Sequence, residues 1–250
     1  MEHESTKDTK LSTPQAILIG AVIVAAAIFL VKMPARPATT NTDPTTTDTT
    51  KGPTADKYAN MILATKAKIT VPEVTATDHV RGASNPKVTI IEYSDTECPF
   101  CRVFHTTMQS VMTKYDGKIA WVYRHYPIES LHKKAINESA ATECVAKLGG
   151  ETAFWNYIDL LYKTTPSNDG LDAAKLPEMA KAVGVDVAKF NTCLSAKETL
   201  PTITKAISDA QAIGISGTPH SFMLVGNDMY KIEGAMPIAS LTAAIDQILK

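Results

Sequence analysis

The chain lacks an excess of charge of either sign and contains few cysteines. Its 25 lysines and arginines nearly balance 26 aspartates and glutamates, so it has no basic excess of the kind that binds nucleic acid. Four cysteines in 250 residues are too few for a disulfide-dense mini-scaffold. No nucleotide or flavin motif and no internal repeat occurs. With 44% hydrophobic residues, the chain is predicted to form one folded domain with appendages.

A long apolar segment lies near the amino terminus. No charged residue occurs between Leu11 and Val31, and as a helix this segment is about 30 Å long, enough to cross a membrane. A cleaved signal peptide is the alternative. However, the first ten residues hold three acids and two lysines instead of a basic region, and no clear cleavage site follows. The sequence therefore predicts a short tail at residues 1–14 and an uncleaved single-span anchor at residues 15–33.

The segment after the predicted anchor has the composition of a spacer. Residues 34–56 are rich in threonine and proline and contain no aromatic residue and no aliphatic residue larger than alanine. Such a segment buries too little apolar surface to offset the entropy of ordering, so it is predicted to be a flexible linker. An O-glycosylated stalk has the same composition. Residues 57–76 are predicted to be an extension of the folded domain, with a short helix over residues 57–68.

The most informative stretch combines a strand, two cysteines and a helix. Lys87–Asp95 is a run of β-branched and aromatic residues typical of a buried strand. The sequence Thr-Glu-Cys-Pro-Phe-Cys follows. Next comes a helical pattern whose apolar stripe consists of Cys101, Phe104, Met108, Val111, Met112 and Tyr115. Cys98 is therefore expected where the strand gives way to the helix, with Pro99 at the first helical position.

This placement predicts redox chemistry of the two thiols. An ordinary thiol is only a few per cent ionised at neutral pH, but the unpaired N–H groups and the dipole at a helix amino terminus stabilise a thiolate. Cys98 is therefore expected to attack or to be attacked. Cys101 lies one turn further on the apolar stripe, so it is expected to be buried and to resolve the mixed disulfide. Stabilising the thiolate also stabilises the reduced form, which makes the disulfide a better oxidant.

Two other interpretations of the CxxC motif stay open. Two cysteines at this spacing form half of a zinc site, which needs four ligands. The other two cysteines lie 43 and 92 residues beyond Cys101 and form no second such motif, and His105 is expected on the flank of the helix. A CxxC pair without any role is the second interpretation. The strand-to-helix context favours redox chemistry over both, so no metal site is predicted.

These residues resemble a known family. The stretch VTIIEYSDTECPFCRVFH is similar to the active-site segment of the DsbA-like oxidoreductases of the thioredoxin-fold superfamily. Later features of the family match RHYPIESLHKKA, ECVAKLGGETAFWNYIDLLY and GISGTPHSFML. The resemblance covers residues 77–250. It implies an α/β fold in which a thioredoxin-like domain, residues 77–130 and 205–250, is interrupted by a helical insertion at residues 131–204.

The resemblance also concerns positions away from the CxxC motif. It implies a cis peptide bond before Pro219, in a loop opposite the cysteines where the Thr218 backbone would pair with a substrate peptide. From the residues alone, an ordinary trans turn is expected. Glu92 matches a buried acid beneath the active site, which would move protons to or from the second cysteine. An exposed glutamate on an edge strand is the alternative. His125 and His132 match common family positions and are expected to have structural or surface roles.

The remaining two cysteines lie in the predicted insertion. Both are on predicted apolar helix faces, formed by Ile136, Ala140, Cys144 and Leu148 and by Phe190, Cys193 and Leu194. Relatives with four cysteines imply a structural disulfide between Cys144 and Cys193. In the chain-entropy account such a bridge stabilises the fold by about 4 kcal/mol. Two separate buried thiols are the alternative.

The sequence thus predicts a membrane-anchored thiol:disulfide oxidoreductase that acts as a dithiol oxidase through Cys98 and Cys101 and needs no cofactor. A disulfide oxidant and a structural disulfide suit an oxidising compartment. The catalytic domain is therefore expected outside the cytoplasm, held at the cell membrane by a single span. Its expected partners are reduced or misoxidised secreted proteins, and the resemblance implies a quinone-linked membrane partner that reoxidises the pair. No nucleic-acid partner is expected, and the chain is expected to be a monomer.

The direction of disulfide exchange is less strongly indicated. Pro99 and Phe100, between the cysteines, are expected to contact substrates. Phe100 differs from the histidine of the best-known oxidases and cannot hydrogen-bond to the Cys98 thiolate. Thr218 before Pro219 is also shared with reductases and isomerases of the superfamily. A disulfide reductase or isomerase of the same fold is therefore one alternative. A non-catalytic, tethered peptide-binding module whose CxxC disulfide is only a brace is the other.

Overall fold

We describe residues 54–250 of a computed structural model of the chain. The predicted tail at residues 1–14, the predicted anchor at residues 15–33 and nearly all of the predicted linker lie outside these residues. Within residues 54–250, no helix combines the length and the hydrophobicity that a membrane span requires.

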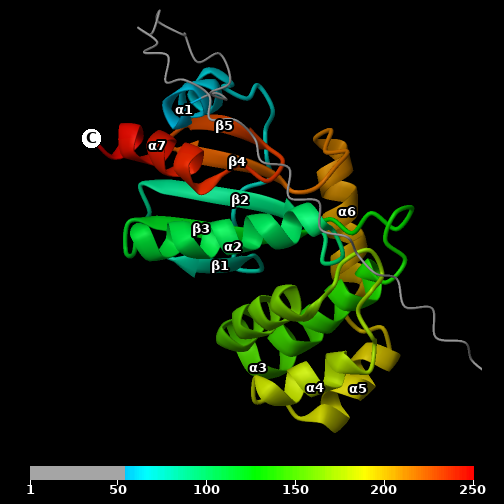
Figure 1. Cartoon of the computed structure of the whole chain (residues 1–250). Helices are drawn as coiled ribbons and strands as arrows, with labels where there is room; N and C mark the ends of the chain where they lie inside the picture. Colours follow the sequence, from blue (N-terminus) through cyan, green and yellow to red (C-terminus); the bar gives the residue numbers. More distant parts are fainter. Residues whose placement is uncertain (1–53) are drawn as a thin grey trace, which may run out of the picture. The chain divides into compact units, whose positions relative to one another are not determined.

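A five-stranded mixed sheet organises this part of the chain (Figure 1). Its strands are β1 (His79–Gly82), β2 (Val88–Ser94), β3 (Ile119–His125), β4 (His220–Val225) and β5 (Asp228–Glu233). Their order across the sheet is β1–β3–β2–β4–β5. β2 and β3 run parallel, and the other neighbouring pairs are antiparallel. The central strand β2 is buried at every position but one, as expected for a strand covered on both faces.

Helices pack on both faces of the sheet. The helices are α1 (Ala55–Ala64), α2 (Pro99–Lys114), α6 (Leu200–Ala212) and α7 (Ile238–Leu249). α1, α2 and α7 contribute to the same buried cluster as Ile90 and Trp121, whereas α6 contributes to the cluster that holds Ile91 and Val122. Successive residues of a strand point to opposite faces, so the two clusters are the two sides of the sheet. α2 buries most of its predicted stripe, and only Met112 is partly exposed.

Helix α1 begins inside the linker that was predicted for residues 34–56, and it ends before residue 68. Ala59 and Ile62 are buried against the main core, which stabilises the helix. The short helix predicted over residues 57–68 is thus present with shifted ends. Asp56 lies in its first turn, where the helix dipole favours a negative charge. The Thr65 hydroxyl donates a hydrogen bond to the Ile62 carbonyl oxygen at 2.8 Å and so helps to end the helix at Ala64.

A helical insertion separates β3 from β4. It contains α3 (Ala135–Thr164), α4 (Lys175–Ala182) and α5 (Val187–Ser195), and the boundary predicted at residue 204 falls within α6. These helices enclose a core of their own that includes Tyr157 and Phe190. α3 is interrupted at Gly150, whose φ of 75° is accessible to glycine but strained for other residues. Leu148, expected on the apolar stripe, is 37% exposed and lies just before this interruption.

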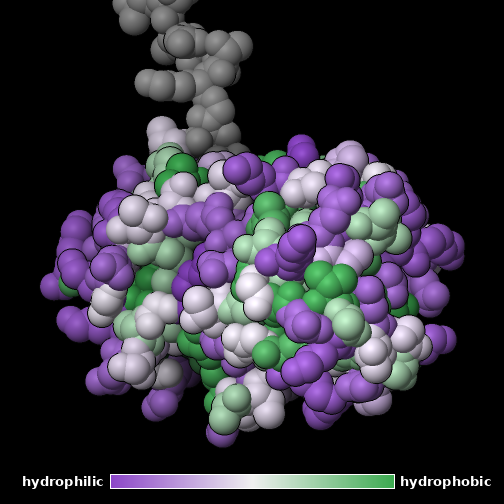
Figure 2. Space-filling model, turned by 90° about the horizontal axis from the view of Figure 1, so that it is seen from below, coloured by the Kyte–Doolittle hydropathy of each residue, from purple (hydrophilic) through white to green (hydrophobic). Residues whose placement is uncertain are grey.

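Most large hydrophobic side chains are buried in three clusters. On the face seen in Figure 2, hydrophilic residues predominate and hydrophobic residues form small groups between them. Two exposed apolar side chains lie in the first turns of α2: Phe100 is 64% exposed and Val103 is 56% exposed. Phe100 lies between the two cysteines and Val103 follows the CxxC motif, so the surface near the two thiols is more apolar than packing of the core requires.

Candidate active site

Cys98 and Cys101 lie where β2 gives way to α2. Cys98 is the residue immediately before Pro99, the first residue of the helix. A proline at this position costs no helical hydrogen bond, because the N–H that it lacks would have no acceptor within the helix. Both cysteines are free thiols; Cys98 is 5% exposed and Cys101 is fully buried. The Cys-Pro-Phe-Cys segment therefore forms the start of α2, with its second sulfur enclosed by the core.

The Cys98 thiol is favoured as an anion. Its pKa is lowered to about 6, chiefly by a hydrogen bond from the Cys101 thiol, and partial burial opposes this shift. The backbone N–H groups of Cys101 and Phe100 contribute further hydrogen bonds. These groups belong to the first turn of α2, where helical N–H groups have no acceptor within the helix. Cys98 is therefore largely a thiolate at neutral pH.

The Cys101 thiol is disfavoured as an anion. Burial raises its pKa well above the usual value, and the hydrogen bond and negative charge of Cys98 raise it further. The Asp95 N–H donates to Cys101 Sγ over 3.5 Å. The two sulfurs thus differ in acidity: Cys98 is the reactive thiolate, and Cys101 stays protonated.

The loop before β4 lies beside the reactive sulfur. The Thr218–Pro219 peptide bond is cis, and the Thr218 carbonyl oxygen lies 3.5 Å from Cys98 Sγ. β4 begins at the next residue, His220, which pairs with Tyr93 near the end of β2. The sheet register therefore holds Thr218 and Pro219 next to the start of α2.

Glu92 is fully buried in the central strand. Its Oε2 accepts a hydrogen bond from Trp121 Nε1 at 2.9 Å, while its Oε1 has no partner. Burial raises the pKa of Glu92 to about 7, and the charge of Glu92 adds to the raised pKa of Cys101. The alternative of an exposed glutamate on an edge strand is wrong, because β3 and β4 flank β2 on both sides. A carboxyl group that titrates near neutral pH thus interacts with the buried thiol.

A polar network that the sequence did not indicate fixes the loop between β2 and α2. The buried Asp95 carboxylate accepts hydrogen bonds from the Glu97 N–H at 2.8 Å and from the Ile128 N–H at 2.7 Å. It also lies 2.9 Å from His132 Nδ1. His132, expected in a structural or surface role, is buried and links the segment after β3 to the active-site loop.

Two buried glutamates, one of which directly precedes Cys98, interact with each other. Glu97 is fully buried and Glu138 of α3 is 2% exposed. Burial and a hydrogen bond with Glu97 raise the pKa of Glu138 to about 9, so the Glu138 carboxyl group is protonated at neutral pH. The acid before the first cysteine is visible in the sequence, but nothing there pairs it with a residue 41 positions later.

Cys144 and Cys193 are joined by a disulfide. The S–S distance is 2.00 Å and the Cα–Cα distance is 5.9 Å. The bridge links α3 to α5 within the core of the insertion. The two cysteines are thus not separate thiols in this structure.

Two groups of side chains bear on metal binding. His105, considered as a third ligand beside the CxxC pair, is buried and places its Nε2 2.7 Å from Asp159 Oδ1 of α3. It is thus engaged by the insertion instead of lying exposed on the helix flank. Elsewhere, His79, His125 and Glu143 bring one potential ligand atom each to within 4.8 Å of one another. The sequence offers no signal for this group because its members form no local motif.

Two solved structures share this architecture. DsbA2 from Pseudomonas aeruginosa is 26% identical, with a TM-score of 0.58 over 70% of this chain and 97% of that one. BdbD from Bacillus subtilis, in its oxidised form, is 17% identical, with a TM-score of 0.60 over 74% of this chain and 96% of that one.

A curated relative is named as a sodium/proton antiporter, not as an oxidoreductase. The Na(+)/H(+) antiporter NhaA 3 of Salinispora tropica is 31% identical over 175 residues, which make up 70% of this chain and 25% of the antiporter. The chain spans about a quarter of the length of the curated relatives that it matches. Residues 74–247 match the family model described as thioredoxin. The chain therefore belongs to the thioredoxin family and has the fold of DsbA-like oxidoreductases.

Proposed function

We propose that the protein is a dithiol oxidase that donates a Cys98–Cys101 disulfide to reduced proteins outside the cytoplasm. The main support is the acidity of Cys98, whose pKa of about 6 contrasts with the raised pKa of Cys101. Stabilising one sulfur of the reduced pair as an anion favours the dithiol over the disulfide. The disulfide is then readily transferred to a substrate.

The exchange proceeds in two steps. A substrate thiolate attacks Cys98 Sγ of the disulfide, forming a mixed disulfide and releasing Cys101 as a thiolate that takes up a proton. A second substrate thiolate then attacks the substrate sulfur of the mixed disulfide and releases Cys98. The substrate loses two electrons and two protons as its disulfide forms, and the Cys98–Cys101 pair is reduced. Cys98 is a good leaving group because its thiolate is stabilised.

Glu92 is the proposed proton carrier for Cys101. A carboxyl group with a pKa of about 7 is protonated in part of the molecules at neutral pH, so it can give a proton to the released Cys101 thiolate. The same group can accept the proton when the pair is reoxidised. Its burial in β2 keeps this exchange within the core.

Substrate recognition is proposed to involve the residues around Cys98. Phe100 is 64% exposed and, with Pro99, offers apolar contact to unfolded chains. Thr218 precedes a cis Pro219, and its backbone lies beside Cys98. An extended peptide that pairs with the Thr218 backbone would present its thiol to this sulfur.

The cellular setting is part of the proposal. Residues 15–33 are proposed to anchor the chain in the cell membrane, with the catalytic domain on the extracytoplasmic side. Support comes from the apolar run of residues 11–31 and from the Cys144–Cys193 disulfide, because such bridges persist in oxidising compartments. The proposed partners are reduced secreted proteins and a quinone-linked membrane protein that reoxidises the pair, and the chain is proposed to act as a monomer. After intact cells are treated with a membrane-impermeant reductant, a membrane-impermeant thiol reagent should label Cys98; labelling only after lysis would refute this orientation.

The reduction potential tests the direction of exchange. The full-length protein is equilibrated with glutathione buffers, and the fraction of reduced Cys98–Cys101 pair is measured. An oxidase is expected to have a potential above about −200 mV, whereas thioredoxin, a reductase, lies near −270 mV. A value near that of thioredoxin would assign the protein to the reductases. This alternative is relevant because the Phe100 side chain supplies no hydrogen-bond donor to the Cys98 thiolate.

Refolding of reduced ribonuclease separates an enzyme from a peptide-binding module. The oxidised full-length protein should restore ribonuclease activity, and Cys98→Ser should abolish this. Ser110→Ala on the exposed side of α2 is the matched control and should refold ribonuclease like the parent. If Cys98→Ser retains full activity in this assay, the CxxC pair has no catalytic role.

A further inference from the structure

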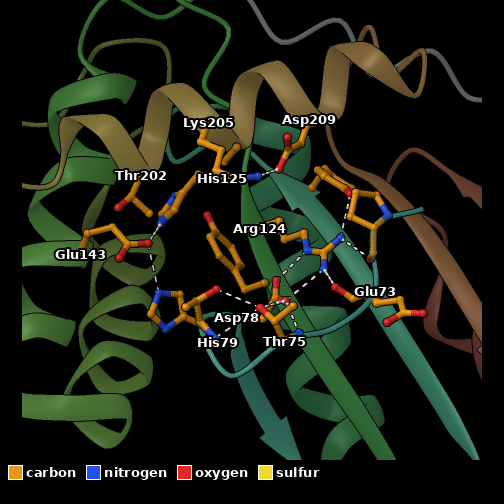
Figure 3. Close-up of a pocket in the computed structure, with 15 residues that line it drawn as sticks. Glu73, Thr75, Asp78, His79, Arg124, His125, Glu143, Thr202, Lys205 and Asp209 are labelled. Carbon is orange, nitrogen blue, oxygen red and sulfur yellow. Dashed lines mark hydrogen bonds and ion pairs between the residues drawn. The ribbon is translucent and has the colours of Figure 1, made fainter. Parts of the chain in front are cut away.

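Three potential metal ligands converge from separate elements (Figure 3). His79 begins β1, His125 ends β3, and Glu143 belongs to α3. His79 Nε2 lies 3.1 Å from Glu143 Oε1, and His125 Nε2 lies 3.2 Å from the same oxygen. Figure 3 shows both imidazole rings directed at the Glu143 carboxylate. Two imidazoles and one carboxylate therefore share a common point between the sheet and the insertion.

We propose that these three residues bind a divalent transition-metal ion of the zinc class, through His79 Nε2, His125 Nε2 and the Glu143 carboxylate. Zinc binds imidazole nitrogen and carboxylate oxygen at about 2.0–2.2 Å, which places neighbouring ligand atoms of a tetrahedral site about 3.3 Å apart. The two observed separations of 3.1 and 3.2 Å are close to this value. Calcium and magnesium require a shell of six or more oxygen atoms, so the two imidazoles select against them.

A second carboxylate orients His79. Glu151 Oε2 lies 3.0 Å from His79 Nδ1, and Glu151 Oε1 accepts a hydrogen bond from the Val80 N–H at 3.0 Å. A metal-binding histidine usually donates its other ring N–H to such a carboxylate, which fixes the tautomer and raises the basicity of the ligand. The His79 ring also stacks on Phe154, with ring centroids 3.4 Å apart. His79 Nε2 is thus held in place for a metal ion.

The surroundings of the three ligands suit a cation with an open coordination position. The ligands line a cavity of about 170 Å³, which leaves room for a solvent ligand. Two cationic side chains also line it, and each is paired with a carboxylate. Arg124 contacts Asp78 at 2.6 and 3.0 Å, and Lys205 contacts Asp209 at 2.5 Å. Neither charge is left to repel a metal ion.

A metal ion competes with contacts that the same side chains make without it. His79 Nε2 and His125 Nε2 both lie within hydrogen-bond distance of Glu143 Oε1, and His79 Nδ1 lies 3.0 Å from Glu151 Oε2. Thr142 Oγ1 lies 3.2 Å from His125 Nε2, and its hydroxyl donates to the Ser139 carbonyl oxygen. Binding therefore displaces the Nε2 proton of His79 and the Thr142 contact, while Glu151 keeps the Nδ1 proton.

Zinc titration of the full-length protein tests this site. Cys98→Ser/Cys101→Ser is the background, because a free dithiol also binds zinc, and any polyhistidine tag is removed. With zinc chloride and a chromogenic indicator, the background protein should bind one equivalent. Glu143→Gln and His125→Gln should weaken binding by more than about 100-fold, and Glu151→Gln by roughly 10- to 100-fold. The matched control, Glu178→Gln on the exposed side of α4, should bind like the background.

Several results would overturn the proposal. The cluster is only an ion-pair network if the background protein takes up no zinc, if Glu143→Gln binds as tightly as Glu178→Gln, or if excess calcium displaces the zinc. Should the ligand variants fail to fold, X-ray absorption at the zinc edge of the background protein decides. Two imidazole ligands support the site, and fewer refute it. Zinc should also raise the melting temperature of the background protein but not that of Glu143→Gln, since only a bound ligand stabilises the fold.

Discussion

Cys98 and Cys101 are the same residue type three positions apart, yet their pKa values shift in opposite directions. Cys98 receives hydrogen bonds at the open start of α2, whereas Cys101 is enclosed by the core, where an anion is poorly solvated. Glu92 follows the second pattern: side-chain hydrogen bonds from Ser94 and Trp121 do not compensate for its burial, and its pKa rises to about 7. The thiol that needs a proton during exchange is therefore buried together with a group that can supply one.

Replacing Glu92 by glutamine tests this proton transfer. Glu92→Gln keeps an acceptor for Trp121 Nε1 but removes the titrating proton. We expect the rate of disulfide exchange at neutral pH to fall by roughly 100-fold, the lower end of the range for general acid–base catalysis. The pH–rate profile should also lose its ionisation near pH 7, which a purely structural effect would leave in place. Stopped-flow fluorescence of the oxidation of a dithiol peptide measures both.

The stability of the same variant provides a second readout. Because the folded pKa of Glu92 is raised from 4.5 to about 7, the unfolded chain releases this proton more readily, and stability is lost as pH rises through this window. Glu92→Gln should therefore be more stable than the parent at pH values above about 7 in urea unfolding. Glu178→Gln, exposed on α4, should change neither the rate nor the stability. A Glu92→Gln variant with an unchanged pH–rate profile would remove Glu92 from the mechanism.

At the scale of elements, local sequence patterns predicted the strand and the helix that a single continuous segment forms. The run Lys87–Asp95 predicted β2, and the apolar stripe after Cys98 predicted α2, because both elements bury one continuous segment of the chain. The ends of α1 were not predicted: the sequence indicated a helix over residues 57–68, whereas α1 spans Ala55–Ala64 and is stabilised by packing of Ala59 and Ile62 against distant residues. Composition describes a segment on its own and contains no information about such a partner.

Clusters of polar side chains that come from several elements could not be predicted from the sequence for the same reason. His79 and His125 approach each other because β1 pairs with β3, with His79 opposite Tyr123. Glu143 joins them only through the position of α3. Glu97 and Glu138 likewise meet across the boundary between the active-site loop and the insertion. Residues that form one local motif, such as Cys98 and Cys101, were predicted from the residues themselves. The cis Pro219 loop and the Cys144–Cys193 bridge were predicted only through the family resemblance.

The Cys144–Cys193 disulfide is expected to stabilise the insertion. It closes a loop with a sequence separation of 49 residues, and in the chain-entropy account its loss costs about 4 kcal/mol. Cys144→Ala/Cys193→Ala should therefore lower the free energy of unfolding by about this amount, measured by urea denaturation. All samples carry Cys98→Ser/Cys101→Ser so that only the structural bridge differs.

A control distinguishes the bridge from the packing of its side chains. The parent in which Cys144 and Cys193 are reduced to thiols, and left unalkylated, keeps both sulfur atoms in the core but lacks the covalent link. It should be destabilised nearly as much as the double alanine variant. If this reduced parent is as stable as the bridged protein, the disulfide contributes through packing alone and the entropic account is wrong.

At the scale of the whole molecule, the insertion is connected to the sheet by polar contacts as well as by packing. Arg81 of β1 forms two hydrogen bonds to Asp159 of α3, at 3.2 and 2.8 Å. The Ser94 and Tyr162 hydroxyl groups lie 2.9 Å apart at the end of β2. The active-site thiols thus lie where the sheet meets the insertion. The free energy of ionising these thiols therefore contributes to the stability of the entire fold.

The stability of the reduced protein should therefore depend on pH through Cys98. Its pKa is about 6 in the folded protein against 9.0 for an ordinary thiol. Between these values the unfolded chain holds a proton that the folded chain has released, so the free energy of unfolding rises with pH. The contribution is complete above pH 9 and is lost as pH falls through about 6. Above pH 9 the raised pKa of Cys101 acts in the opposite direction, and stability falls again.

Comparison of the parent with Cys98→Ser isolates this effect, because all other titrating groups are common to both proteins. The two are unfolded in urea at a series of pH values from about 5 to about 9, with the CxxC pair reduced, the Cys144–Cys193 bridge intact and reductant removed under inert gas. The difference in free energy of unfolding, parent minus Cys98→Ser, should increase steadily from pH 6 upward. A difference that stays constant over this range would mean that the Cys98 thiolate is no more stable in the folded protein than in the unfolded chain. The disulfide would then have no driving force for transfer to a substrate.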